Sequence, residues 1–378
     1  MSTTVIRAGS LLRLACLAAV GAGIAAADEP SAERGDNRPP LRVEQLEKSV
    51  FQRVPGKAGQ GSVLGKGPAG SWYADTVGLP TVHFDGELYR MWFSGDEPAT
   101  TRGFPYGIIQ RIGLATSTDG VHFEVANNGR PVLEPGPEGS ADDRGLAHPF
   151  VLRFDDRFWM WYGAIDGTTA GDLKLTPASV RVERICLATS GDGIHWQREN
   201  GGRPVLDIGP AGTIDCIQAT GMHVLRIADR FVMWYGAYGS QRHVLAVATS
   251  PDGIHWERSH GGTPVTGLLE GGQGPCGVSV YFDGQKYFML YGSSATRQWN
   301  TYAAVSSDGF NFTRLHGDQP ILGPAPEGNF DTAGIGRNRC VHPTQFIILG
   351  NKVWLWYVGE DGAPPHGQRI GLMEAVIP

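Results

Sequence analysis

Short runs of apolar and polar residues, separated by turn residues, repeat along the whole chain. Residues 146–216 show the unit: HPFVLRF leads to a turn at 155–156, then to RFWMWYG, a long polar loop, RICLATS, a turn at 191–193 and IHWQR. Runs of this length, rich in β-branched and aromatic residues, are typical of strands joined by hairpin turns. The unit therefore predicts a four-stranded antiparallel meander.

The same pattern recurs with a nearly regular period. The second-strand motif ends at residues 93, 162, 235, 291 and 357, with spacings of 69, 73, 56 and 66 residues. The third-strand motif ends in an Asp-Gly turn at residues 120, 193, 253 and 309. A repeat of four strands is the signature of a propeller blade. We predict an all-β, five-bladed β-propeller of four-stranded antiparallel blades, forming one domain over residues 41–378.

The two ends of the repeat array complement each other. From Phe51 the chain reads like the fourth strand of a blade, whereas the last repeat, which begins at Cys340, has only three strands. Pairing the two removes the free edges that an open ring would expose. We expect the N-terminal strand to close the last blade.

The predicted topology separates two faces of the propeller. Turns between strands one and two, such as 84–86 and 282–284, are short, as are the Asp-Gly turns. The loops between strands two and three are longer and lie on the opposite face; they span 94–110, 163–183, 236–242, 292–300 and 358–368. Function concentrates in long loops on a rigid scaffold. We expect a site at the mouth of the central channel on this face, next to blades one and two.

The N-terminus has the pattern of an export signal. Arg7 and Arg13 accompany an apolar stretch over 14–24, and an A-x-A site follows at 25–27. This pattern predicts a signal peptide over 1–27, a disordered leader over 28–40 and a secreted or periplasmic protein. Cleavage would move the formal charge from -6 to -8 because both arginines leave. An acidic chain without a basic cluster argues against nucleic acid as a partner, and no other apolar run is long enough to span a membrane.

Composition fits the predicted class. The chain has 378 residues with 54 Gly and 25 Pro, as suits a turn-rich β protein. Apart from Cys16, which lies in the expected signal, there are four cysteines: Cys186, Cys216, Cys276 and Cys340. Export permits disulfides, and Cys276 and Cys340 both precede the first strand of neighbouring blades. We favour that pair, with buried thiols as the alternative.

Residues that recur in several blades are expected to be structural. Tryptophans recur at equivalent positions of the second strand, which packing explains better than sugar stacking: Trp92, Trp161, Trp234 and Trp356. Aspartates recur at the blade junctions, at Asp142, Asp215 and Asp331, and arginines recur before the third strand, at Arg111, Arg184 and Arg369. Their joint occurrence predicts an ion pair within the blade.

Polar residues that break the repeat near the innermost strands are the candidates for a site. They are Asp75, Asp143, Arg144, His148, Gln218, Thr220, His223, Arg337, Asn338, Arg339 and His342. Acidic, basic and imidazole groups around one channel mouth suit a polar ligand, although a solvated loop side chain is the alternative for each. The three histidines come from three blades without the short-range spacing of metal ligands, so we expect no metal and no other cofactor.

With these features the chain resembles the five-bladed propeller glycosidases of glycoside hydrolase family 43 and their fructan-cleaving relatives. The resemblance covers the architecture of nearly the whole mature chain. It implies a base or nucleophile Asp at the first innermost strand, an orienting Asp in blade two and a general-acid Glu in blade three. Asp75 matches the first position and Asp143 matches the second.

The third position departs from that pattern. Blade three begins IQATGMHVL at residue 217 and contains no glutamate. Glycoside cleavage normally needs two carboxyl groups, one of them protonated. The proton donor stays open between Asp215, Glu270 and an imidazole from His148, His223 or His342.

The resulting hypothesis is a secreted, glycoside hydrolase-like propeller that acts on a furanose or pentose glycan. The partner is then a carbohydrate or another small polar ligand, while the oligomeric state stays open. The alternatives are a non-catalytic propeller that binds glycan or protein, and an enzyme of unrelated chemistry, because fold alone does not determine function.

Overall fold

The computed structural model describes residues 41–98, 108–239, 242–269, 274–294, 299–326, 328–332, 341–360 and 367–378. The signal peptide expected at 1–27 and the leader expected at 28–40 lie outside these residues.

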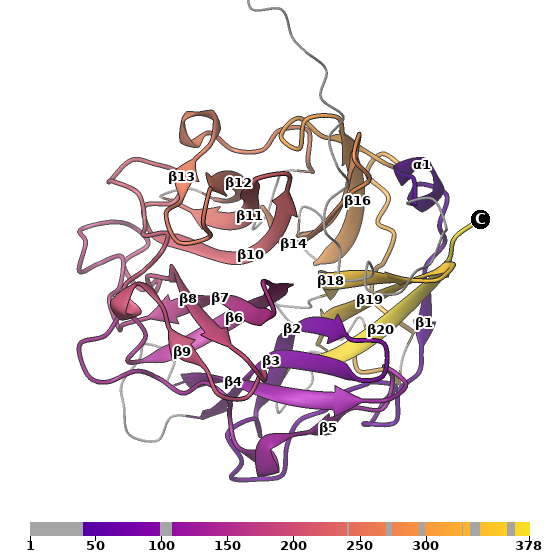
Figure 1. Cartoon of the computed structure of the whole chain (residues 1–378), viewed down its shortest axis with the longest axis horizontal. Helices are drawn as coiled ribbons and strands as arrows, with labels where there is room; N and C mark the ends of the chain where they lie inside the picture. The colour runs from indigo at the N-terminus through magenta and orange to yellow at the C-terminus, as the bar shows by residue number, and fades with distance from the viewer. Residues whose placement is uncertain are drawn as a thin grey trace, which may run out of the picture.

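Five four-stranded antiparallel sheets stand around a common axis (Figure 1). Blade one has β2 (Thr76–Phe84), β3 (Tyr89–Pro98), β4 (Ile108–Ser117) and β5 (Glu124–Val125). Blade two has β6 (Gly145–Phe154), β7 (Arg157–Ile165), β8 (Arg184–Ser190) and β9 (Gln197–Arg198), and blade three has β10 (Gln218–Ile227), β11 (Arg230–Tyr238), β12 (His243–Ser250) and β13 (Glu257–Arg258). Blade four has β14 (Pro275–Phe282), β15 (Tyr287–Ser293), β16 (Asn300–Ser306) and β17 (Thr313–Arg314). Short 3-10 turns follow three of the outer strands at Asn127–Gly129, Asn200–Gly202 and His260–Gly262. The predicted five-bladed propeller is confirmed.

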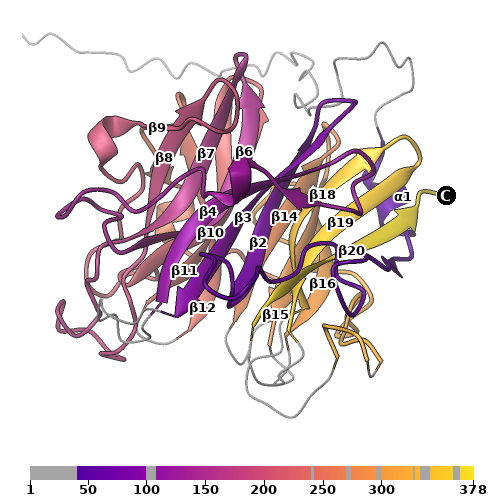
Figure 2. The same ribbon diagram turned by 90° about the horizontal axis from the view of Figure 1, so that it is seen from below.

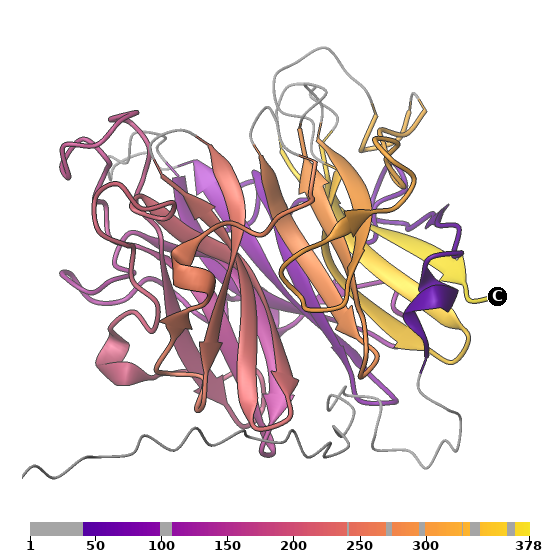
Figure 3. The ribbon, with the colours of Figure 1, turned by 90° about the horizontal axis from the view of Figure 1, so that it is seen from above.

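Blade five is completed by the N-terminal strand. It contains β18 (Val341–Leu349), β19 (Lys352–Gly359), β20 (Arg369–Val376) and β1 (Gln52–Val54), which pairs with β20 in the register Arg53↔Met373. The short helix α1 (Val43–Leu46) lies beside this blade in both side views (Figures 2 and 3). Its Val43 amide donates a 2.9 Å hydrogen bond to Asp283 Oδ2 of blade four, so the N-terminal segment joins blades four and five. The predicted closure is confirmed.

The first strand of each blade lines the axis, and these strands are tied to one another. Thr81 Oγ1 and the Val82 amide both donate 2.6 Å hydrogen bonds to Gln345 Oε1 of the preceding blade. Thr81 Oγ1 in turn accepts from the Val151 amide at 3.2 Å, and Ser279 Oγ accepts from the Phe346 amide at 3.1 Å. We call this level of the channel the girdle.

The recurring tryptophans have the predicted packing role, and the structure shows that they pack between blades. All four are buried, and each Nε1 donates to the carbonyl of the Asp-Gly turn of the next blade, at Gly193, Gly253, Gly309 and Gly120. A side chain repeated in the sequence thus forms a repeated contact.

The junction aspartates are also structural, but their arginine partner differs from the predicted one. Asp142 Oδ2 accepts from Tyr162 Oη at 2.9 Å and from Arg198 Nε at 2.8 Å. The same triad recurs as Asp215–Tyr235–Arg258 and as Asp331–Tyr357–Arg53. The arginine therefore comes from the outermost strand, whereas Arg184, the first residue of β8, binds Asp166 and Asp207. The predicted pairing was wrong because the outer strand, not the third, passes over the junction.

Of the four cysteines outside the expected signal peptide, Cys186 and Cys216 are free and buried. Cys340 lies outside the described residues, so the favoured Cys276–Cys340 pair stays a prediction.

Candidate active site

Charged side chains gather at the mouth of the channel, at the ends of the strands of blades one and two. Asp75 and Asp96 come from blade one, and Arg181, Glu183 and His148 come from blade two. The mouth is the face on which the long loops lie, as expected from the sequence.

Asp96, near the end of β3, is the most unusual carboxyl group of blade one. Asp96 is 6% exposed, and its Oδ1 has no hydrogen-bond partner among the described residues. Burial, followed by the negative charge of Asp75, raises its pKa to about 6, although a hydrogen bond from Thr76 and the charges of Arg181 and Lys66 oppose the rise. Asp96 therefore retains a proton at a pH where an ordinary aspartate is ionised.

Asp75 lies beside Asp96 because the two strands pair at this edge. The Asp75 amide donates a 3.1 Å hydrogen bond to the Asp96 carbonyl, and Thr76 pairs with Asp96 in the ladder. The structure thus brings the sequence candidate Asp75 together with a second carboxyl group.

Glu183 is a buried carboxylate held in place by its backbone and by Arg181. Its amide and carbonyl bond Ile217 and Ala219 of blade three at 3.3 and 3.0 Å. Arg181 Nε donates to Glu183 Oε1, and Arg181 Nη1 reaches Gln110 Oε1 of blade one at 2.9 Å. Burial alone would raise its pKa, but Arg181 and His148 lower it below the ordinary value. Glu183 is therefore an ionised carboxylate at the mouth.

His148 lies next to Glu183, with its Nε2 3.9 Å from Glu183 Oε2. Burial lowers its pKa, the charge of Arg181 adds to this effect and Glu183 opposes it. Its backbone amide donates a 3.1 Å hydrogen bond to Ser94 Oγ of blade one. His148 is therefore attached to blade one through its backbone, and its ring faces Glu183.

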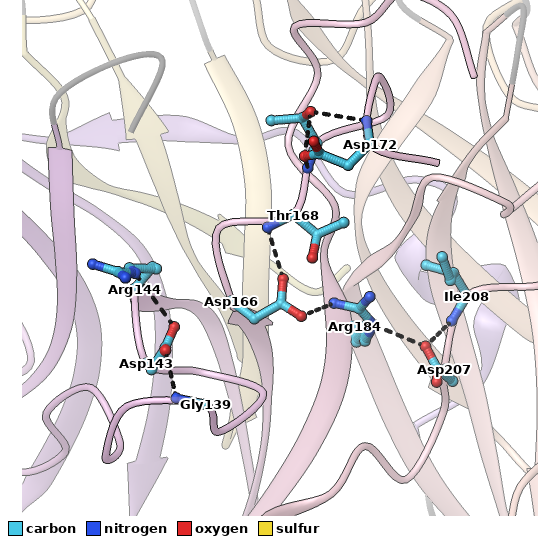
Figure 4. A network of polar contacts seen from close by, with 10 residues as sticks. Gly139, Asp143, Arg144, Asp166, Thr168, Asp172, Arg184, Asp207 and Ile208 are labelled. Carbon is cyan, nitrogen blue, oxygen red and sulfur yellow. Dashed lines mark hydrogen bonds and ion pairs between the residues drawn. The ribbon is translucent and has the colours of Figure 1, made fainter. Parts of the chain in front are cut away.

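The predicted pair Asp143 and Arg144 belongs to the rim of blade two (Figure 4). Asp143 Oδ2 accepts from the Gly139 amide at 2.8 Å, and Oδ1 lies 3.6 Å from Arg144 Nε. Figure 4 shows the neighbouring rim network, in which Arg184 joins Asp166 to Asp207. Asp143 thus stabilises its own turn, and Glu183 is the blade-two carboxylate that contacts Arg181.

Two other predicted residues are structural. Asp215, one of the open candidates for the proton donor, is fully buried in the junction triad, where it binds Tyr235 and Arg258. His223 is 4% exposed at the level of the girdle, with its ring 4.6 Å from that of Phe150. Burial lowers its pKa to about 3, so the ring is neutral and forms part of the channel wall. A residue on the innermost strand is thus not necessarily exposed to the channel.

Gln218 has an indirect role. It is 8% exposed, and its Nε2 donates a 3.0 Å hydrogen bond to the Arg181 carbonyl. It therefore positions the segment that carries Arg181 and Glu183. Glu270 and Arg339 lie outside the described residues, and His342 is placed in β18 without a described side chain.

The sequence interpretation missed Asp96, Arg181 and Glu183. Each is at the end of one of the two longest loops, and neither carboxylate recurs at its position in every blade. Glu183, for example, corresponds to Gln110 of blade one. A residue-by-residue comparison of the loop ends would have revealed Glu183.

Within the described ranges, no group of His, Cys, Asp and Glu has the arrangement of a metal site. No helix in those ranges is long and apolar enough to cross a membrane.

Asp96 makes folding stability depend on pH. Its pKa is about 6 in the folded protein against an ordinary value of 3.8, so folding favours the protonated form. The resulting penalty is absent below about pH 4, grows between pH 4 and 6, and reaches about 3 kcal/mol above that range. Asp96→Asn removes it, so we expect the variant to gain stability over wild type at pH 7.5 but not at pH 4. Urea unfolding at both values measures this, and an equal gain at both would contradict it.

Comparison with known proteins gives distant relatives. No family model matches the chain. An uncharacterised protein of Mycobacterium tuberculosis (strain CDC 1551 / Oshkosh) is 25% identical over 259 residues, which are 66% of this chain and 79% of that protein. A 1,2-β-oligomannan phosphorylase of Thermoanaerobacter sp. is 32% identical over 91 residues, only 24% of this chain and 26% of the phosphorylase.

Solved structures share the fold over most of their length. A structure of a glycoside hydrolase has a TM-score of 0.65 at 20% identity, over 88% of this protein and 95% of that one. A β-1,2-mannobiose phosphorylase from Listeria innocua, in complex with β-1,2-mannobiose, has a TM-score of 0.60 at 13% identity, over 80% of this protein and 90% of that one. A family 117 glycoside hydrolase of Zobellia galactanivorans has a TM-score of 0.61 at 13% identity, over 87% of this protein and 91% of that one. The protein is thus a five-bladed propeller of the type found in glycoside hydrolases and phosphorylases, whereas the narrower resemblance to family 43 and fructan-cleaving enzymes stays a prediction.

Proposed function

We propose that this protein cleaves glycosidic bonds at the mouth of its central channel. The observation that carries the proposal is Asp96, a buried carboxyl group with a raised pKa that lies beside a second carboxyl group, Asp75. Two acidic groups whose environments separate their pKa values are the arrangement that acid and base chemistry needs. The likeness to propeller glycosidases and phosphorylases supports a glycoside as the substrate.

In this proposal, Asp96 is the general acid. It donates its proton to the oxygen of the departing sugar, so that this oxygen leaves as a hydroxyl group rather than as an alkoxide. Asp75 supplies the second carboxyl group, as base or nucleophile. Glu183 and Arg181 hold the blade-two side of the site, and Glu183 takes the orienting role first expected of Asp143.

Two similarities to known enzymes indicate which sugars the substrate contains. The resemblance to family 43 favours a furanose or pentose glycan, and the local similarity to a 1,2-β-oligomannan phosphorylase adds β-1,2-mannosides. Action on such glycans outside the cell agrees with the export signal expected at residues 1–27.

A non-catalytic glycan-binding propeller is the second candidate. The start of β10, where the resemblance expects the acid, presents Gln218 and Thr220 instead of a carboxyl group. Such a protein would bind the same sugars without cleaving them.

A glycan panel separates the two functions. Wild type is incubated with arabinofuranosides, xylosides, fructans and β-1,2-mannosides, with and without inorganic phosphate, and released sugar is measured alongside binding. We expect turnover of one class, with a loss of about 100-fold or more in kcat/KM in Glu183→Gln, because Arg181 and His148 lose the charge that they face. Binding of a glycan without any turnover would establish the second candidate.

A further inference from the structure

His148 lies at a bulge in the channel wall. Every innermost strand has a register shift at the same level, just on the mouth side of the girdle. In β6 the shift includes His148, whose φ is +54°. The equivalent position is Leu79 in blade one and glycine in blades three and four, Gly221 and Gly277, with φ of +55°, +58° and +57°. The left-handed conformation therefore belongs to a bulge that these blades share, and His148 is the titratable side chain that this bulge carries in blade two.

The ring of His148 has two distinct sides. Nε2 is the atom that faces Glu183 Oε2 at 3.9 Å, whereas Nδ1 lies toward Gly221, where an added Cβ would be 3.6 Å away. A carboxylate beside Nε2 favours the tautomer that carries its proton there, which leaves the lone pair on Nδ1. The imidazole therefore presents an acceptor on the side of Gly221.

That side is a cavity on the propeller axis. All five innermost strands contribute to its lining, including His148, Gly221 and Gly277. The two glycines leave room because they have no side chains, and among the described residues the lining contains no charged group except a protonated His148. Lys66 and Arg181 act instead on Asp96, and Arg181 also binds Glu183 and Gln110. Such a cavity suits a small neutral molecule and disfavours a phosphate dianion.

We infer that the axial cavity holds the water that attacks the sugar, and that Nδ1 of His148 accepts its proton. The inference rests on the proposed function and makes the reaction a hydrolysis rather than a phosphorolysis. The water oxygen bonds to the anomeric carbon as the bond from that carbon to the leaving oxygen breaks. The water proton goes to Nδ1, and the leaving oxygen takes the proton of Asp96. His148 thereby takes the base role that the proposed function gave to Asp75, and the charge of Asp75 instead helps to keep Asp96 protonated.

The protonation state of His148 agrees with this role. Burial and Arg181 lower its pKa, against the opposing charge of Glu183, and His243 is the other titratable group that interacts with it. The ring is therefore an unprotonated base at neutral pH.

The product distinguishes the two reactions. We expect the glycan that the wild type cleaves to yield free reducing sugar at the same rate with or without inorganic phosphate. Formation of a sugar 1-phosphate, or a requirement for phosphate, would overturn the inference while leaving glycosidic cleavage intact. An absence of cleavage under all conditions would instead refute the proposed function.

The variant His148→Gly tests the base itself. Glycine is the residue of blades three and four at this position, so the fold should accept it. We expect kcat to fall by about 100-fold or more, with partial recovery on adding imidazole, because a free base can replace the missing ring. His195→Ala is the control, since that histidine is exposed on the opposite face beside Asp192 and should retain full activity. A loss without recovery, together with a larger loss in Asp75→Asn, would move the base role to Asp75.

Discussion

Asp96→Asn is expected to lower kcat/KM by about 100- to 10,000-fold on natural glycosides, because it removes the proton that the leaving oxygen needs. The amide has the shape of the carboxylic acid but cannot donate this proton. The loss should depend on the leaving group: dinitrophenyl glycosides, whose phenolate departs without protonation, should lose less than about 10-fold. Comparing the two substrate types in one variant measures acid catalysis separately from binding.

The pH profile provides a second measurement of the same group. In the wild type, activity should fall as pH rises through about 6, where the buried Asp96 loses its proton. The falling limb should be absent from Asp96→Asn. Asp143→Asn is the matched control, because Asp143 caps its own turn at Gly139, and it should keep both the limb and most of the activity. A leaving-group effect in Asp143→Asn instead of Asp96→Asn would place the acid on the rim.

The architecture was predictable because its causes are local and repeated. Strand motifs, Asp-Gly turns and buried tryptophans occur in successive repeats, and each contact recurs where its motif recurs. The closing strand was predictable for the same reason, since residues after Phe51 match a fourth strand that the last repeat lacks. Even there, the partner of the junction aspartate was missed, because the arginine comes from a strand of only two residues.

The site was only partly predictable because its contacts are non-local. Arg181 meets Gln110 across a gap of 71 residues, and the environment of Asp96 combines four separate segments. The sequence pointed to Asp75 and His148 but also to Asp143, since all lie near the starts of innermost strands. Only the folded protein shows that Asp143 binds its own turn while Glu183 faces His148.

Replacing Arg53 in the closing strand β1 is expected to cause a large loss of folding stability. Arg53 of β1 donates from Nε to Asp331 Oδ2 at 2.9 Å, where Tyr357 Oη also donates at 2.9 Å. Asp331 is buried, and its Oδ1 has no partner among the described residues. Arg53→Met would leave this carboxylate buried without a counter-charge, which costs about 3–5 kcal/mol. Chemical unfolding should show this loss, and Asp331→Asn in the same protein should restore part of it.

Arg258→Met is the matched variant that separates ring closure from charge burial. Arg258 Nε bonds the buried Asp215 at 2.7 Å, with Tyr235 in the same role as Tyr357, but this triad lies at the junction of blades two and three. We expect a similar loss of global stability in both variants, because each leaves one buried carboxylate unpaired. Only Arg53→Met should also weaken the pairing of β1 with β20, since Arg53 itself belongs to the closing strand. Hydrogen exchange at the amides of β20 should therefore accelerate more in Arg53→Met than in Arg258→Met, where only the shared loss of global stability acts on them. Equal exchange at β20 in the two variants would mean that the N-terminal strand is held by α1 and its backbone ladder rather than by the arginine.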